Sequence, residues 1–164
     1  SKYSFKEYLN KPDIAGIICN QDQEILNNSD EDIFSIYNNF YSRTGFFRLF
    51  DKKTGELYSY NKESKSYYSL QNYQVIRSIE DGDIEGEIVT DIGYIKDSFL
   101  YVDTIILVEG NQTYRAFRFK VNLKTPELIH ADPEIDGSLY KCRNIQLPNN
   151  IEIKSAEEIY FEEF

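Results

Sequence analysis

The chain has 164 residues, a size that suits one domain, and 41% of them are hydrophobic, which is too many for a disordered chain. Its formal net charge of −10 opposes binding to nucleic acids and to anionic membrane surfaces, and favours a basic protein as partner. With 14 Tyr and 11 Phe but no Trp and no Met, the composition favours strands.

Two helices are predicted near the N-terminus. The first begins at Ser4, which has the spacing of a capping box with Glu7, and it ends at Pro12. The second begins after Ser29, carries acidic residues in its first turn and apolar residues on one face, and ends near Gly45. Both helices should pack on an apolar surface.

Short strands joined by polar turns dominate the rest of the sequence. Residues 46–50 and 56–60 flank a five-residue turn whose Gly55 can adopt a positive φ, which predicts a hairpin. The other predicted strands are residues 14–19, 66–70, 73–79, 84–90, 99–108, 113–123, 128–130, 139–142 and 151–153. Residues 20–28 are predicted to form a loop or frayed turn, and a last amphipathic turn opens at Ser155, with Glu158 at the capping spacing.

Most strand connections are too short for a crossover between parallel strands, so we expect an antiparallel sheet. The predicted fold class is α+β: a curved antiparallel sheet of about six to eight strands, with two N-terminal helices packed on one face. A β-barrel with a capping helix is the alternative. The whole chain, residues 1–164, is predicted to be a single domain.

The two cysteines, Cys19 and Cys142, are far apart and lack the spacing of a metal site. Free buried thiols in a reducing compartment are the favoured interpretation, and a disulfide in an exported protein is the alternative. No apolar run has transmembrane length, and the chain does not start like a signal peptide. We therefore favour a soluble cytoplasmic protein, with export after removal of a leader as the alternative.

Residues for nucleophilic catalysis are scarce. His130 is the one histidine, and Asp132 stands where it could orient a catalytic imidazole, but a structural role is favoured. Cys19 lies in an apolar strand, where a thiol is usually protonated and inert. No zinc cluster, phosphate-binding glycine loop or dinucleotide fingerprint occurs. The sequence therefore predicts a protein that is not an enzyme and that binds neither a cofactor nor a metal.

Two acidic turns, residues 81–86 and 132–137, have the spacing that opens an oxygen-ligand calcium loop. The position of the closing bidentate carboxylate is occupied by Ile92 in one and by Arg143 in the other. We therefore interpret both as acidic turns and not as metal sites.

The acids fall in blocks without basic residues, which either form dispersed solvated faces or are gathered by folding into one negative surface. The second arrangement predicts an inhibitor or toxin-neutralising (immunity-type) protein that captures a basic protein. The predicted partner-binding residues are Asp81, Asp83, Glu85, Asp132 and Asp136. One alternative is a small apolar ligand in an aromatic-lined cavity beside the helix at residues 33–40. Another is an acid-dependent hydrolase, which requires two facing carboxylates.

Overall fold

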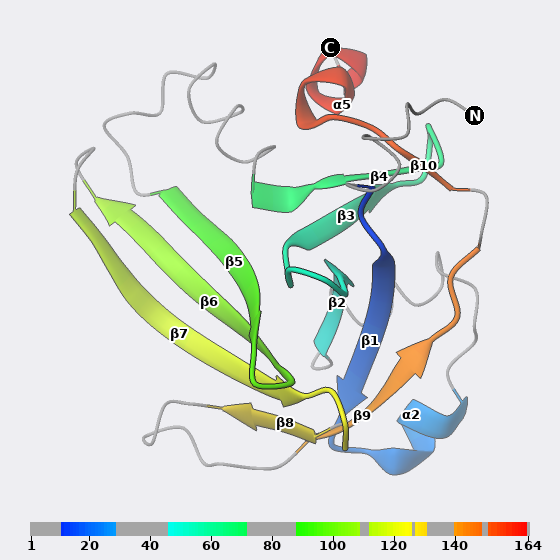
Figure 1. The fold of residues 1–164 in the computed structure, drawn as a ribbon, viewed down its shortest axis with the longest axis vertical. Helices are drawn as coiled ribbons and strands as arrows, with labels where there is room; N and C mark the ends of the chain where they lie inside the picture. The colour runs from blue at the N-terminus through cyan, green and yellow to red at the C-terminus, as the bar shows by residue number, and fades with distance from the viewer. Residues whose placement is uncertain are drawn as a thin grey trace.

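The computed structural model describes residues 11–28, 46–71, 88–108, 112–125, 127–130, 140–148 and 151–163, and more than half of these residues lie in strands. In chain order the elements are β1 (Ile14–Asn20), α2 (Gln23–Asn28), β2 (Phe46–Asp51), β3 (Leu57–Asn61), β4 (Ser66–Ser69), β5 (Ile88–Lys96), β6 (Phe99–Val108), β7 (Gln112–Asn122), β8 (Glu127–His130), β9 (Tyr140–Ile145), β10 (Glu152–Ile153) and α5 (Ala156–Glu163). Figure 1 shows α5 at the top of the molecule and α2 at its foot.

Hydrogen bonds join these ten strands into one sheet with the order β10-β4-β3-β2-β1-β9-β8-β7-β6-β5. Among the described strands every pairing is antiparallel, except that the short β10 runs parallel to β4. Antiparallel pairing follows where a short turn joins consecutive strands, as between β2 and β3, β3 and β4, and β5 and β6. Because β1 lies in the middle of this order, it is the strand around which the two halves of the sheet are arranged.

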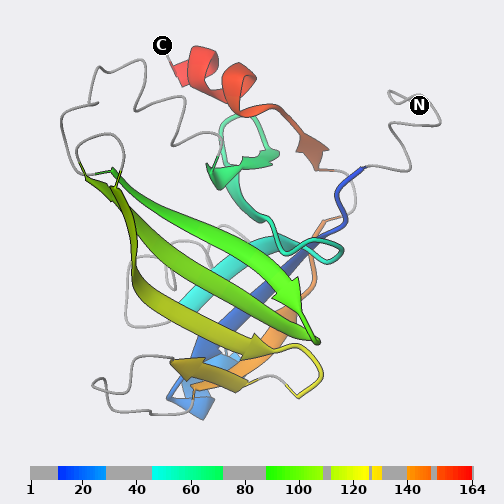
Figure 2. The ribbon, with the colours of Figure 1, turned by 60° about the vertical axis from the view of Figure 1, so that its left-hand side comes forward.

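The sheet bends so strongly that its two halves form two layers. Figure 2 shows β5, β6 and β7 in front, crossing over β1, β2 and β9. The free edge of β5 meets the β2–β3 turn, where the backbone N–H of Ile95 donates to the carbonyl oxygen of Thr54 at 3.1 Å. A Cβ on Gly93 would lie only 2.3 Å from the carbonyl oxygen of Gly55, so this contact requires glycine at position 93.

Strand β1 is buried on both faces. Ile17, Ile18 and Cys19 are all fully buried, and they alternate between two hydrophobic clusters. Ile17 and Cys19 face the cluster between the two layers, whereas Ile18 faces a second cluster that β3, β4 and α2 complete. The apolar run at residues 14–19 predicted such a buried strand, and the structure confirms it.

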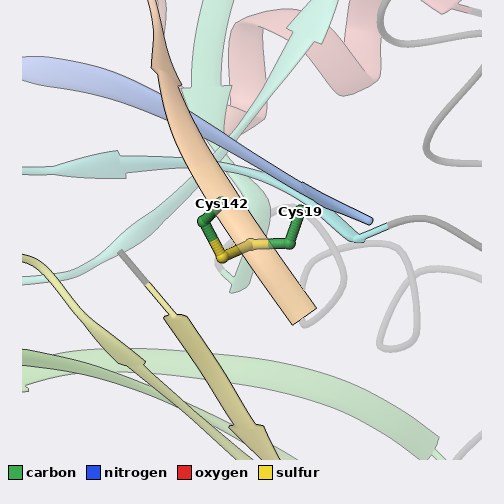
Figure 3. Close-up of a disulfide and its surroundings, with 2 residues drawn as sticks. All are labelled: Cys19 and Cys142. Atoms are coloured by element: carbon green, nitrogen blue, oxygen red, sulfur yellow. A yellow bond between two sulfur atoms is a disulfide. The ribbon is translucent and has the colours of Figure 1, made fainter. Parts of the chain in front are cut away.

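The prediction of free thiols is wrong. Cys19 of β1 and Cys142 of β9 occupy directly opposite positions in the antiparallel ladder, with their Cα atoms 4.0 Å apart, and their sulfur atoms are bonded. Figure 3 shows this disulfide crossing from β1 to β9. The sequence could not predict the pairing because 123 positions separate the two residues and only the sheet register brings them together.

The predicted α+β fold class is also wrong, because the described residues are mostly strand and include only two short helices, α2 and α5. Neither helix matches the two that were predicted near the N-terminus. Those two segments lie outside the described residues, except for residues 11 and 12, which are not helical. The barrel alternative is wrong too, since the order of the described strands is open, with β10 and β5 at its edges. None of the described helices has the length and apolar character needed to cross a membrane.

Local turn and cap predictions agree with the structure. Gly55 has a φ of 83° and closes the predicted hairpin between β2 and β3. The backbone N–H of Glu158 donates to the hydroxyl of Ser155 at the start of α5, as a capping box requires. The loop predicted for residues 20–28 is instead α2, which Asp22 caps by accepting from the backbone N–H of Glu24 at 2.9 Å.

The disulfide should contribute strongly to stability, because it restricts the unfolded chain over a long loop. We expect the double variant Cys19→Ala/Cys142→Ala to lose about 2–5 kcal/mol of unfolding free energy, measured by urea denaturation. Reducing agent should lower the denaturation midpoint of the wild type and leave that of the double variant unchanged. A wild-type midpoint that does not respond to reduction would contradict this expectation.

Candidate functional site

The pairing of β1 with β9 stops abruptly at one end. The last paired residues are Gly16 and Ile145, although β1 begins two residues earlier, at Ile14. In a continued register Pro148 would oppose Asp13, but proline has no N–H to donate, so it does not extend a ladder there. The ladder ends before that position: beyond Gly16 the two strands separate, and the following segment leads to β10 beside β4. This separation opens a groove.

The groove has a volume of about 920 Å³, which lies within the usual range for small-molecule sites. Its walls come from the start of β1, the β2–β3 turn, the end of β9, β4 and β10. The described lining residues are Lys11, Pro12, Asp13, Ile14, Ala15, Gly16, Phe50, Lys52, Lys53, Tyr67, Leu123, Asn144, Ile145, Gln146, Leu147, Pro148, Ile151 and Ile153. Most of these side chains are apolar, but the surface that the groove exposes also includes many polar atoms, so the groove offers a mixed polar and apolar lining.

Glycine at position 16 permits the close packing at the inner end of the groove. A Cβ at this position would lie 2.5 Å from Cγ1 of Ile145, so the isoleucine side chain occupies the space that a larger residue would fill. Ile14, Leu147, Ile151 and Ile153 pack against the same buried cluster. The apolar wall is therefore an extension of the core.

The polar rim is held by the carboxylate of Asp51, which is 6% exposed. Its Oδ1 accepts from the backbone N–H groups of Lys53 at 3.0 Å and Asp13 at 3.3 Å. The carbonyl oxygen of Asp13 in turn accepts from the N–H of Lys52 at 2.9 Å. These bonds tie the β2–β3 turn to the start of β1, so the backbone that carries the two lysines has a fixed position.

Tyr67 of β4 also lines the groove, and its side chain is unusual. The residue is 3% exposed and its ring packs edge-on against that of Tyr60, with centroids 5.6 Å apart. Its hydroxyl is buried without a hydrogen-bond partner. Burial, with a smaller effect from Tyr60, raises the pKa of this hydroxyl above its ordinary value, so it keeps its proton. Tyr67 therefore holds a donor that has no acceptor.

The five residues predicted to bind a basic partner lie outside the described residues: Asp81, Asp83, Glu85, Asp132 and Asp136. The structure describes only where their segments join the sheet, before Ile88 at the start of β5 and after His130 at the end of β8. Because β5 and β8 run in opposite directions, both junctions lie toward the same end of this half of the sheet, on the left in Figure 1. The gathered acidic surface stays a prediction.

The groove differs from the sites that the two alternative hypotheses predict. The aromatic-lined cavity was expected beside a helix at residues 33–40, which lie outside the described residues, whereas the groove lies at the open end of β1. Among the described lining residues Asp13 is the one carboxylate, so the groove lacks the facing pair that a hydrolase of the expected kind requires. No group of three or more potential metal ligands occurs among the described residues.

Comparisons with known proteins find no match: the sequence fits no protein-family model, and neither the curated proteins nor the solved structures contain a similar chain. The groove must therefore be interpreted from its own residues. Sequence reasoning missed it because the groove is lined by segments that meet only in the folded chain, and only the fold reveals that the Tyr67 hydroxyl has no partner.

Removing the Tyr67 hydroxyl should not harm the folded protein. An unpaired buried hydroxyl costs about 1–3 kcal/mol, so Tyr67→Phe should raise or preserve the unfolding free energy of the ligand-free protein. Tyr58→Phe is the matched control, because the buried Tyr58 donates its hydroxyl to Oε2 of Glu56 at 3.4 Å. We expect that control to lose about 0.5–1.5 kcal/mol in urea denaturation. Equal losses in both variants would show that the Tyr67 hydroxyl has a partner.

Proposed function

We propose that this chain is a non-enzymatic binding protein that holds a small molecule in the groove between β1 and β9. The observation that carries the proposal is the groove itself, about 920 Å³ in volume, whose lining combines side chains that extend the core with lysines on a turn of fixed position. Unpaired buried polar groups are rare in folded proteins. The hydroxyl of Tyr67, a residue of the groove lining, is such a group.

The shape and lining of the groove support the same proposal. Small-molecule sites are concave, mostly apolar and equipped with a few polar groups that fix the orientation of the ligand. The partly buried Ile14, Leu147 and Ile153 provide apolar contact, and the exposed Lys52 and Lys53 provide polar groups. The walls belong to the sheet and its core, so the site is formed before the ligand arrives and binding requires little ordering.

A second candidate function is the capture of a basic protein by the acidic segments, as an inhibitor or immunity-type protein would do. The described residues carry nearly equal numbers of acidic and basic side chains, so most of the net charge of −10 belongs to the remaining segments. Charge concentrated in this way favours electrostatic steering of a basic partner.

The disulfide supports a location outside the reducing cytoplasm. Disulfides persist in secreted and periplasmic proteins and are rare where glutathione and thioredoxin keep thiols reduced. Cys19 and Cys142 pair in the centre of the sheet, where their bond joins the two strands that form the groove. We therefore propose an oxidising compartment in place of the cytoplasmic location that the sequence favoured.

The ligand site can be tested with 1-octanol as the probe in isothermal titration calorimetry. We expect octanol to bind the wild type and to bind Tyr67→Phe with similar affinity, because the buried hydroxyl of Tyr67 has no surface for a ligand to contact. Leu147→Trp should abolish binding because it fills the groove, whereas Phe161→Trp, at an exposed position of α5, should bind like the wild type. Equal binding by all four proteins would contradict the proposed site.

The second candidate predicts that neutralising the five predicted acids weakens capture of a basic protein. The variant replaces Asp81, Asp83, Asp132 and Asp136 by Asn and Glu85 by Gln. A control with the same net charge neutralises five acids of the described residues, namely Glu24, Glu63, Asp97, Glu152 and Glu157. Using polylysine as the probe, we expect only the first variant to lose most of the salt-dependent affinity. Equal losses in the two variants would show that net charge alone explains the affinity, and would contradict a dedicated acidic surface.

A further inference from the structure

The opening of the groove carries an excess of positive charge, although the chain as a whole has a net charge of −10. Its described lining includes three lysines, Lys11, Lys52 and Lys53, against the single carboxylate of Asp13. All three lysines are exposed, which places them at the opening and not among the buried apolar residues. Salt screens charges more than about 10 Å away, so lysines at contact distance dominate the potential that a bound group experiences.

The ammonium groups of this rim keep donors for a ligand. Nζ of Lys53 donates to the carbonyl oxygen of Lys11 at 2.6 Å, which uses one of its three N–H groups. Nζ of Lys52 lies 3.4 Å from Oδ2 of Asp13, and both side chains are more than half exposed. Exposed ion pairs of this kind are weak, so an incoming carboxylate can share the lysine.

Below the rim, apolar side chains line the groove. Ile151 and Ile153 are partly buried, pack against the cluster that contains the buried Ile145, and leave the rest of their surface to the groove. An aliphatic chain that covers this surface removes it from water, which is the dominant favourable contribution to association. The groove therefore combines an apolar wall with a cationic opening.

We propose that the groove binds an anionic amphiphile, whose aliphatic body lies along Ile145, Ile151 and Ile153 and whose carboxylate lies beside Lys52 and Lys53. The proposal rests on the proposed function of the groove and names the class of its ligand. The fixed turn matters for this class of ligand. Asp51 holds the backbone N–H of Lys53 and the carbonyl oxygen of Asp13 holds that of Lys52, so the backbone of the rim does not have to be ordered when the anion binds.

The test compares three probes with the same aliphatic chain: octanoate, 1-octanol and octyltrimethylammonium. Titrated into the full chain in the calorimeter, octanoate should bind about tenfold more tightly than octanol, because charge-assisted hydrogen bonds are stronger than neutral ones. The cation should bind most weakly. Lys52→Gln/Lys53→Gln should remove the preference for octanoate over octanol, and high sodium chloride should reduce that preference in the wild type.

The control variant is Lys62→Gln/Lys65→Gln, which removes the same charge from the exposed β3–β4 turn, outside the described groove lining. This control should keep the preference for octanoate. Equal affinities for octanoate and octanol, or equal effects of the two lysine pairs, would overturn the anionic ligand while leaving the groove a binding site. Failure of all three probes to bind would overturn the proposed function as well.

Discussion

The pairing of β1 with β9 is the interaction on which the rest of the structure depends. It joins the two halves of the sheet, since β2 to β4 and β10 lie on one side of this pair and β5 to β8 on the other. At one end the pair is locked covalently by Cys19 and Cys142, and at the other it stops at Gly16 and Ile145. The same two strands thus hold the fold together and, where they part, create its groove.

The groove combines features that oppose stability with features that favour binding. A continued ladder would satisfy more backbone groups, and a partner for the hydroxyl of Tyr67 would remove the cost of its burial. In natural proteins, residues that oppose the locally favoured structure occur mostly at functional sites. Other parts of the fold offset their energetic cost. Here the offset comes from the buried part of β1 and the cross-strand disulfide, which lie next to the site.

Short-range signals in the sequence predicted the parts of the fold that depend on neighbouring residues. The buried strand at residues 14–19, the hairpin closed by Gly55 and the cap at Ser155 all follow from local periodicity or turn chemistry. The short helix α2 was missed because its six residues contain little apolar periodicity, and its main signal is the cap at Asp22.

Long-range features could not be predicted in the same way. The bond between Cys19 and Cys142 depends on the sheet register, and the layering depends on the contact between Gly93 and the β2–β3 turn. The groove arises from chain segments that meet only after folding, so neither Tyr67 nor Lys53 stood out in the sequence. The acidic segments that did stand out lie outside the described residues, and their role stays a prediction.

The most direct measurement is an isotope-filtered nuclear Overhauser experiment on the full chain saturated with octanoate. If the groove is the binding site, the methylene protons of the ligand should contact the methyl groups of Ile145, Ile151 and Ile153, which line it. Contacts to the methyl groups of Leu100 and Val121, which belong to the core between the layers, would contradict the proposed site.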